Sequence, residues 1–269
     1  MQQNIHNLVW TSDIHLNFVH FSQWRNILSS FCDLGDGVLV TGDIADGLDC
    51  KAAIEAMNDM PKPIYFVTGN HDYYHSSFSA VDKICNSVKD QDTGAIWLEK
   101  HGPIKLSDES VLVGVGGWAD ARSGKSFYDS NVRLADHEII ADLKCSKHDQ
   151  LRVIQNRAKK AEEILRRQLS LAFKTNPKTV YVATHVPAFA ETNLAPNGKF
   201  SDGDFLTHFN WHGLEELLVD VSEEHPEINF IHLSGHTHTG ASYKRGNIYS
   251  RVASARYHDP KVEDVLAIF

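Results

Sequence analysis

Residues 63–72 read PIYFVTGNHD, an apolar run typical of a β-strand that ends directly in the polar cluster Gly69-Asn70-His71-Asp72. Two earlier stretches have the same form, since residues 7–15 read NLVWTSDIH and residues 37–43 read GVLVTGD. Patterns of helical period lie between these strands, at residues 18–31 and 51–57. This alternation predicts right-handed crossovers and a parallel sheet core, so the fold class is α/β.

The rest of the chain continues this pattern less regularly. A helix is expected at 77–88 and a long amphipathic helix at 150–173, which we interpret as packed on a sheet rather than on a partner or membrane. Short apolar runs, which favour antiparallel edge strands or a second sheet, occupy 95–98, 104–106 and 111–115. Further strands are expected at 180–183, 229–233 and 264–269, with a hairpin over 242–253 that turns at 245–247.

Two segments, 119–138 and 187–211, have no regular pattern. Long loops inside a compact domain are usually functional. The sequence contains no internal repeat and no Pro-, Gly- or Ser-rich linker, so we expect residues 1–269 to form a single domain.

Composition restricts the classes of function. The net charge of −9 and the lack of a basic stripe count against polymeric nucleic acid as a partner. The four cysteines are widely spaced and indicate free thiols in a reducing compartment. Residues 1–4 do not begin a secretory signal, and no apolar run is long enough to span a membrane. We therefore expect a cytoplasmic protein that does not bind membranes.

Polar clusters follow five of the strand-like runs. They are Asp13-Ile14-His15, Gly42-Asp43, Gly69-Asn70-His71-Asp72, Thr184-His185 and Gly235-His236-Thr237-His238. Each cluster alone is also compatible with an ordinary turn, cap or solvated pair, but their joint occurrence is not explained in that way. If the loops converge at one sheet edge, their side chains form the ligand set for two divalent metal ions, which is suited to attack on phosphate esters.

The residue types fit that chemistry. Alternate residues of an extended chain point the same way, so Asp13 and His15 can face one ion. Asp43 has two carboxylate oxygens and can bridge two ions, while Asn70 is a neutral oxygen ligand that limits negative charge. Imidazole nitrogens complete the set at His185, His236 and His238. This mixture of nitrogen and oxygen ligands favours Mn, Fe, Zn or Co over Ca or Mg.

The five clusters, in this order over residues 13–238, resemble the motifs of the calcineurin-like metallophosphoesterase superfamily. The resemblance implies a four-layer α/β/β/α sandwich of two mixed sheets flanked by helices. It also implies that one metal is held by Asp13, His15, Asp43 and His238, and the other by Asp43, Asn70, His185 and His236. A hydroxide that bridges the two metals would attack phosphorus. In vitro, both metals are most simply supplied as Mn.

In that picture His71 is the general acid or charge stabiliser at the leaving oxygen. Asp46, three residues after Asp43, is the candidate carboxylate that orients His71, and Asp72 is the alternative, although Asp72 could equally cap the next helix. Gly47 stands where the Ser/Thr protein phosphatases have an arginine. The chain therefore looks unlike that branch and more like the broad bacterial-type phosphoesterases.

Other residues are weaker candidates for substrate contacts. The basic residues of the first loop could meet a phosphate but are better interpreted as solvated, and the aromatic residues after the third cluster could wall the pocket or pack in the core. A lid role for the second loop and a cleft-lining Trp118 are further possibilities. These candidates are Arg122, Lys125, Arg133, Tyr73, Tyr74, His75, His208, Trp211 and His212.

The leading hypothesis is a metal-dependent phosphatase or phosphodiesterase that acts on a small or nucleotide-like phosphate ester. A nuclease of the DNA-repair branch is the first alternative, which the acidic composition disfavours. The second alternative is a non-catalytic scaffold, which the complete ligand set and His71 disfavour. The sequence leaves open the substrate, the choice between monoester and diester, the native metal and the oligomeric state.

Overall fold

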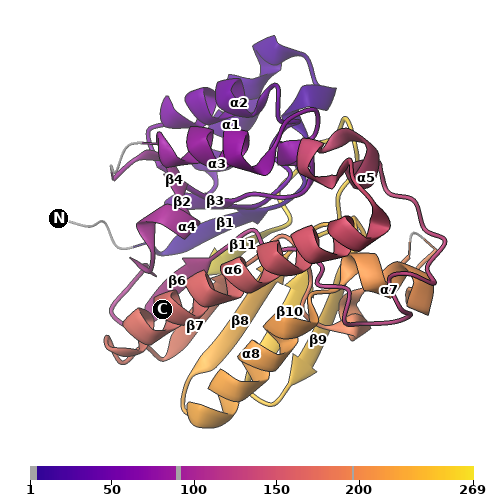
Figure 1. Cartoon of the computed structure of the whole chain (residues 1–269). Helices are drawn as coiled ribbons and strands as arrows, with labels where there is room; N and C mark the ends of the chain where they lie inside the picture. The colour runs from indigo at the N-terminus through magenta and orange to yellow at the C-terminus, as the bar shows by residue number, and fades with distance from the viewer. Residues whose placement is uncertain (1–4, 89–91, 196) are drawn as a thin grey trace.

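Two β-sheets lie face to face at the centre of the protein in the computed structural model, which describes residues 5–88, 92–195 and 197–269 (Figure 1). The N-terminal residues 1–4, considered above for a secretory signal, lie outside the described residues. The first sheet has the order β11-β1-β2-β3-β4, with strands β1 to β4 parallel and β11 antiparallel to β1. Its strands are β1 (Asn7–Thr11), β2 (Gly37–Thr41), β3 (Pro63–Val67), β4 (Gly94–Trp97) and β11 (Asp264–Ala267).

The second sheet has the order β5-β6-β7-β8-β10-β9, with antiparallel strands only at its two edges. Its strands are β5 (Ile104–Lys105), β6 (Ser110–Gly114), β7 (Thr179–Ala183), β8 (Asn229–Ser234), β9 (Ala241–Arg245) and β10 (Ile248–Val252). Both sheets are therefore mixed.

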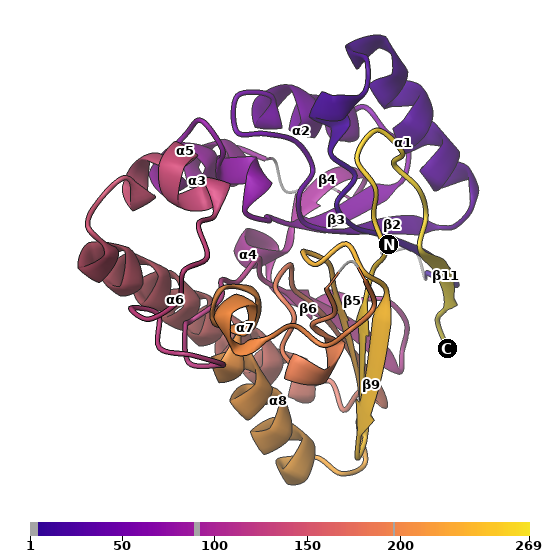
Figure 2. The same cartoon turned by 90° about the vertical axis from the view of Figure 1, so that its right-hand side faces the viewer.

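Helices cover the outer face of each sheet (Figures 1 and 2). The first sheet is covered by α1 (Trp24–Asp33), α2 (Cys50–Asn58) and α3 (Phe78–Asn86). The second sheet is covered by α6 (Lys147–Phe173) and α8 (His212–Glu224). The layers thus run α/β/β/α, which confirms the expected fold class.

Alternation along the strands builds two separate cores. Leu8 and Trp10 of β1 point between the sheets, where they join residues of the second sheet such as Tyr181. Val9 of β1 and Val40 of β2 point the other way, into the core under the helices. A strand that is buried on both faces must be apolar at every position, and this is why β1, β2 and β3 are continuous apolar runs in the sequence.

Gln168 is a buried polar residue on the inner face of α6. Its Nε2 donates to the carbonyl oxygens of Leu98 (2.9 Å) and Gly114 (3.2 Å), and its Oε1 accepts from the amide of Gly114 (2.8 Å). These bonds attach the helix to the end of β6 and satisfy backbone groups that water cannot reach.

Several predicted elements need correction. β4 is a parallel strand of the first sheet and not an antiparallel edge, because α3 is a crossover helix that returns the chain parallel to β3. α1 begins at Trp24 and not at Phe18, because the loop after β1 first forms two short 3-10 turns. Helix α8 was not among the predicted elements.

Short helices also occur inside the two segments that lack a sequence pattern. They are α5 (Ala135–Ile139) in the first, and η5 (Ala190–Thr192) and α7 (Gly203–Phe209) in the second. The remaining short helices are α4 (Leu98–His101), η1 (Leu16–Phe18), η2 (Phe21–Gln23), η3 (His71–Tyr73) and η4 (Ala141–Leu143). Over the described ranges, no helix combines the length and the apolar character needed to cross a membrane.

Candidate metal centre

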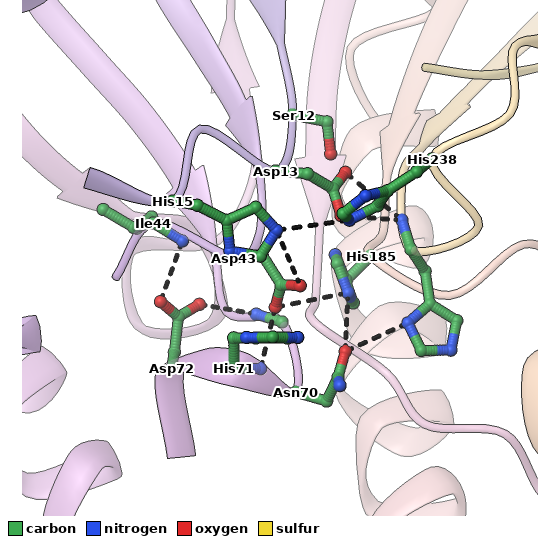
Figure 3. Close-up of polar contacts among 12 residues, drawn as sticks. Ser12, Asp13, His15, Asp43, Ile44, Asn70, His71, Asp72, His185 and His238 are labelled. Carbon is green, nitrogen blue, oxygen red and sulfur yellow. Dashed lines mark hydrogen bonds and ion pairs between the residues drawn. The ribbon is translucent and has the colours of Figure 1, made fainter. Parts of the chain in front are cut away.

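The five polar clusters converge where β1, β2, β3, β7 and β8 end, as expected for the carboxyl ends of parallel strands (Figure 3). Backbone hydrogen bonds join the loops directly. The amide of His15 donates to the carbonyl of Asp43, and the amide of Gly235 donates to the carbonyl of His185, both over 3.0 Å. The first bond joins the loops after β1 and β2 of the first sheet, and the second bond joins the ends of β7 and β8 of the second sheet. The site is therefore built from both sheets.

The first group of side chains consists of Asp13, His15, Asp43 and His238. Each offers one nitrogen or oxygen ligand atom, and these four atoms all lie within 4.8 Å of one another. Nε2 of His238 lies 3.2 Å from Nε2 of His15 and 3.2 Å from Oδ1 of Asp13. Nε2 of His15 lies 3.8 Å from Oδ2 of Asp43. The group can therefore hold one cation among two carboxylates and two imidazoles.

The second group shares Asp43 with the first. Oδ1 of Asp43 lies 3.4 Å from Nε2 of His185, so the two carboxylate oxygens face different groups. Oδ1 of Asn70 lies 3.0 Å from Nε2 of His185 and 3.0 Å from Nδ1 of His236. A carboxylate that bridges two metal ions must face a different group with each oxygen, as Asp43 does.

Metal ligands must be ionised carboxylates and neutral imidazoles, and the pKa shifts of three ligands suit that role. Burial lowers the pKa of His15 to about 3 and lowers the pKa of His236 well below its usual range. Burial alone would raise the pKa of Asp13, but the hydrogen bond from His238 and the neighbouring imidazoles outweigh it, and the pKa is lowered. Burial and the nearby carboxylate of Asp13 instead raise the pKa of Asp43 well above its usual range, which a bound cation would offset.

His185 gives an independent test of whether the site fits a cation. Its Nδ1 lies 2.9 Å from the carbonyl oxygen of Thr41, and its Nε2 lies near the oxygens of Asn70 and Asp43. Both nitrogens face acceptors, yet a neutral imidazole carries one N–H. When Nδ1–H donates to Thr41, the Nε2 lone pair faces oxygen lone pairs, and a cation between these atoms resolves the conflict.

The backbone around the site is held in an unusual conformation. Asp13, His15, Asp43, His236 and His238 have φ values of 50°, 40°, 51°, 73° and 57°, in the left-handed region that residues other than glycine seldom occupy. Such a conformation costs about 1–3 kcal/mol per residue and persists only where surrounding contacts enforce it. Surrounding contacts therefore hold five predicted metal ligands in strained backbone conformations. Asp13 and His15 face the same group through left-handed turns and not through the extended backbone expected from the sequence.

Two glycines allow the ligands to pack so closely. A Cβ on Gly69 would overlap Oδ1 of Asp43, and a Cβ on Gly235 would overlap Oδ2 of Asp13. The Gly-Asn and Gly-His pairs of the sequence thus reflect close approach of backbone to a carboxylate.

His71 lies beside the shared carboxylate. Its amide donates to Oδ1 of Asp43 (2.9 Å), and its Nδ1 lies 3.5 Å from Oδ1 of Asp46, a distance beyond an ordinary hydrogen bond. Burial lowers the pKa of His71, but attraction to Asp43 and interaction with Asp46 outweigh it, so the pKa is raised.

Asp72 neither orients His71 nor caps the next helix, which corrects both interpretations given above. Its carboxylate accepts a hydrogen bond from the amide of Ile44 (2.9 Å), as Figure 3 shows. It also accepts from the amides of Ala45 (3.0 Å) and Gly69 (2.7 Å). Ser77 caps α3 instead. Asp72 therefore joins the loops after β2 and β3, which carry Asp43 and Asn70.

The loop candidates separate into two classes. Arg122 forms an ion pair with Glu216 and Lys125 forms one with Asp204, and Arg133 is exposed, which fits solvated loop charges. His75 is exposed as well, and His212 lies close to Glu215 and Glu216.

By contrast, a small pocket beside the second group is lined by residues that include Asn70, Trp118, Asp136, His137, His208 and His236. Trp211 is fully buried against Gly117, and Tyr73 is buried in the core.

Sequence reasoning missed Tyr257 and Asp136. The ring of Tyr257 lies 4.7 Å from that of His15 and 5.0 Å from that of His238, between centroids, and Tyr257 remains 44% exposed above the first group. Tyr257 follows β10, which is parallel to β8, so a polar cluster after a strand was the available signal. Asp136 lies in α5 and had no such signal.

Comparison with known proteins agrees with this architecture. Phosphopantetheinyl hydrolase (PptH) from Mycobacterium tuberculosis is similar in structure with a TM-score of 0.65 and 14% identity, over 93% of this chain and 89% of that chain. TT1561 of Thermus thermophilus is similar with a TM-score of 0.52 and 12% identity, over 93% of this chain and 90% of that chain. At such identities the likeness shows the fold alone, and no curated protein matches the sequence. The family model for calcineurin-like phosphoesterases matches residues 6–240, and the chain therefore belongs to that family.

Proposed function

We propose that this protein is a dimetal-dependent hydrolase of phosphate esters, a phosphatase or phosphodiesterase that acts on a small or nucleotide-like substrate. The observation that carries the proposal is the division of Asp43, whose Oδ2 faces His15 and whose Oδ1 faces His185. A single carboxylate between two groups of nitrogen and oxygen donors is suited to hold two divalent ions. Membership of the phosphoesterase family supports the reaction class.

In this proposal Asp13, His15, Asp43 and His238 hold one ion, and Asn70, His185 and His236 hold the other together with Asp43. When bound, two divalent ions such as Mn²⁺ neutralise phosphoryl charge and make water a stronger nucleophile. The Thr41 carbonyl fixes the His185 ring, so that Nε2 would be available to hold the second ion.

His71 would donate a proton to the leaving oxygen or stabilise the negative charge that develops there. Asp46 on the Nδ1 side leaves Nε2 for the substrate. Removal of a general acid typically lowers the rate about 10²- to 10⁴-fold.

Because all four cysteines are free thiols, we also propose a cytoplasmic location.

The test is hydrolysis of bis(p-nitrophenyl) phosphate and p-nitrophenyl phosphate by metal-stripped protein refilled with Mn²⁺. Turnover that needs Mn²⁺ and is lost in Asp43→Asn supports the proposal, and the ratio of the two rates defines the ester class. His71→Ala should lose activity while His6→Ala, at the opposite end of β1, should keep it. Absence of both turnover and bound metal would refute the proposal.

A further inference from the structure

Asn70 has to present a particular end of its side chain to the site. Its amide has an oxygen that can bind a cation and an NH₂ group that cannot. Oδ1 lies 3.0 Å from both Nε2 of His185 and Nδ1 of His236, so the oxygen faces the second group. The two ends have nearly the same shape, and packing alone cannot tell them apart. Some hydrogen bond at the other end must select this orientation.

The phenol of Tyr74 supplies that hydrogen bond. Its oxygen accepts from Nδ2 of Asn70 over 3.3 Å, and its hydroxyl donates to Oδ2 of Asp136 over 3.0 Å. All three side chains are buried, so water does not substitute for these partners. The donor and acceptor roles in these two hydrogen bonds follow from Asp136, because a carboxylate can only accept a hydrogen bond.

The hydroxyl of Tyr74 has one proton, which it uses to donate the hydrogen bond to Asp136. Only lone pairs of Tyr74 then remain for Asn70, and these can pair with NH₂ but repel a carbonyl oxygen. A flipped amide would place oxygen against oxygen at Tyr74 and NH₂ against the second group. The Asp136–Tyr74 pair thus favours the one orientation that is useful for a cation.

From this geometry we propose that Tyr74 and Asp136 are positioning residues that lock the Asn70 amide with its oxygen toward the second metal. The inference rests on the proposed function, in which Asn70 is a ligand. It also gives a role to the segment 119–138, whose helix α5 carries Asp136. The Tyr74 ring packs on His71 as well, with centroids 4.0 Å apart and planes at 31°.

Tyr74→Phe is the direct test, because it keeps the ring on His71 and removes only the hydroxyl. Mn²⁺ is titrated into the metal-stripped full chain by isothermal calorimetry. We expect one Mn²⁺ to bind about 10- to 100-fold more weakly than in wild type and the other to be little changed. Asp136→Asn should act in the same direction, because an asparagine N–H can donate to Tyr74 and free its proton for the oxygen of a flipped Asn70.

Tyr73→Phe is the matched control. The Tyr73 hydroxyl is buried and bonds to Thr68 (2.8 Å) and Asp82 (3.1 Å), so its loss should lower thermal stability and leave Mn²⁺ affinity unchanged. This control separates a general loss of stability from a loss of amide orientation.

An Asn70→Asp background tests the mechanism itself. A carboxylate offers oxygen at either end, so Tyr74→Phe should cost less than about threefold in Mn²⁺ affinity there. An equal loss in both backgrounds would overturn the orientation argument, as would unchanged affinity of Tyr74→Phe in a chain that binds two Mn²⁺. Failure of the wild-type chain to bind two Mn²⁺ would instead overturn the proposed function, and the inference with it.

Discussion

His232 makes the stability of this protein depend on pH. It is fully buried on β8, where its Nε2 lies 2.9 Å from Oγ1 of Thr184 and its Nδ1 lies 2.9 Å from Oγ of Ser250. Burial lowers its pKa from 6.5 to about 3. The folded protein therefore keeps His232 neutral at a pH where the unfolded chain protonates it.

The sign and size follow from proton linkage. Above pH 6.5 His232 is neutral in both the folded and the unfolded state. Below pH 6.5 it becomes protonated in the unfolded chain, whereas in the folded protein it stays neutral until the pH falls to about 3. At about pH 5 this costs RT ln(1 + 10^1.5), or about 2 kcal/mol of unfolding free energy. The figure hardly changes for any folded pKa below about 4, so it depends little on that value.

The assay compares urea unfolding of wild type and His232→Gln at about pH 8 and about pH 5, with chelator present so that metal binding does not contribute. His232→Gln loses stability at both pH values, but its loss between them should be about 2 kcal/mol smaller than that of wild type. Other titrating groups occur in both proteins and cancel in this comparison. An equal loss between the two pH values would refute the reasoning.

Three further predictions follow from individual contacts. Gly69→Ala should displace Asp43 and lower the metal content measured by mass spectrometry, whereas Gly240→Ala, whose Cβ would meet only Ser254 at 3.3 Å or beyond, should not. Gln168→Leu should lower the urea-unfolding free energy by about 2–3 kcal/mol, because backbone groups of Gly114 and Leu98 lose their partners; a change near zero would contradict this. Free Mn²⁺ at about 100 times its dissociation constant should raise the unfolding free energy by about 2.7 kcal/mol and chelator should reverse it, so equal melting with and without Mn²⁺ would count against a metal centre.

Much of the fold could be predicted because buried parallel strands leave a strong signal. β1, β2 and β3 coincide with the apolar runs that open the stretches 7–15, 37–43 and 63–72, since both faces of each strand must be apolar. β4 was assigned to the wrong kind of sheet because a four-residue strand does not indicate its neighbour. The short helices α5 and α7 were missed because one or two turns contain too few residues to establish a helical period.

The candidate site was predictable to the same degree as its strands. The residue types after β1, β2, β3, β7 and β8 indicated metal ligands, and the structure brings these side chains together. Asp72 was misinterpreted because its partners, the amides of Ile44, Ala45 and Gly69, lie in two different loops, after β2 and after β3. A carboxylate next to a helix has the same sequence pattern whether it caps that helix or joins two loops.

The sequence by itself determined which strands form and which donors follow them, because apolar runs and polar clusters are local properties of the chain. Only the tertiary structure decided that the Thr41 carbonyl fixes the His185 ring and that Tyr257 covers the first group. It also decided that Asp136, 62 residues from Tyr74, sets the orientation proposed for Asn70. These contacts depend on crossover paths and strand register, which fix distances between residues far apart in the chain and leave no local pattern.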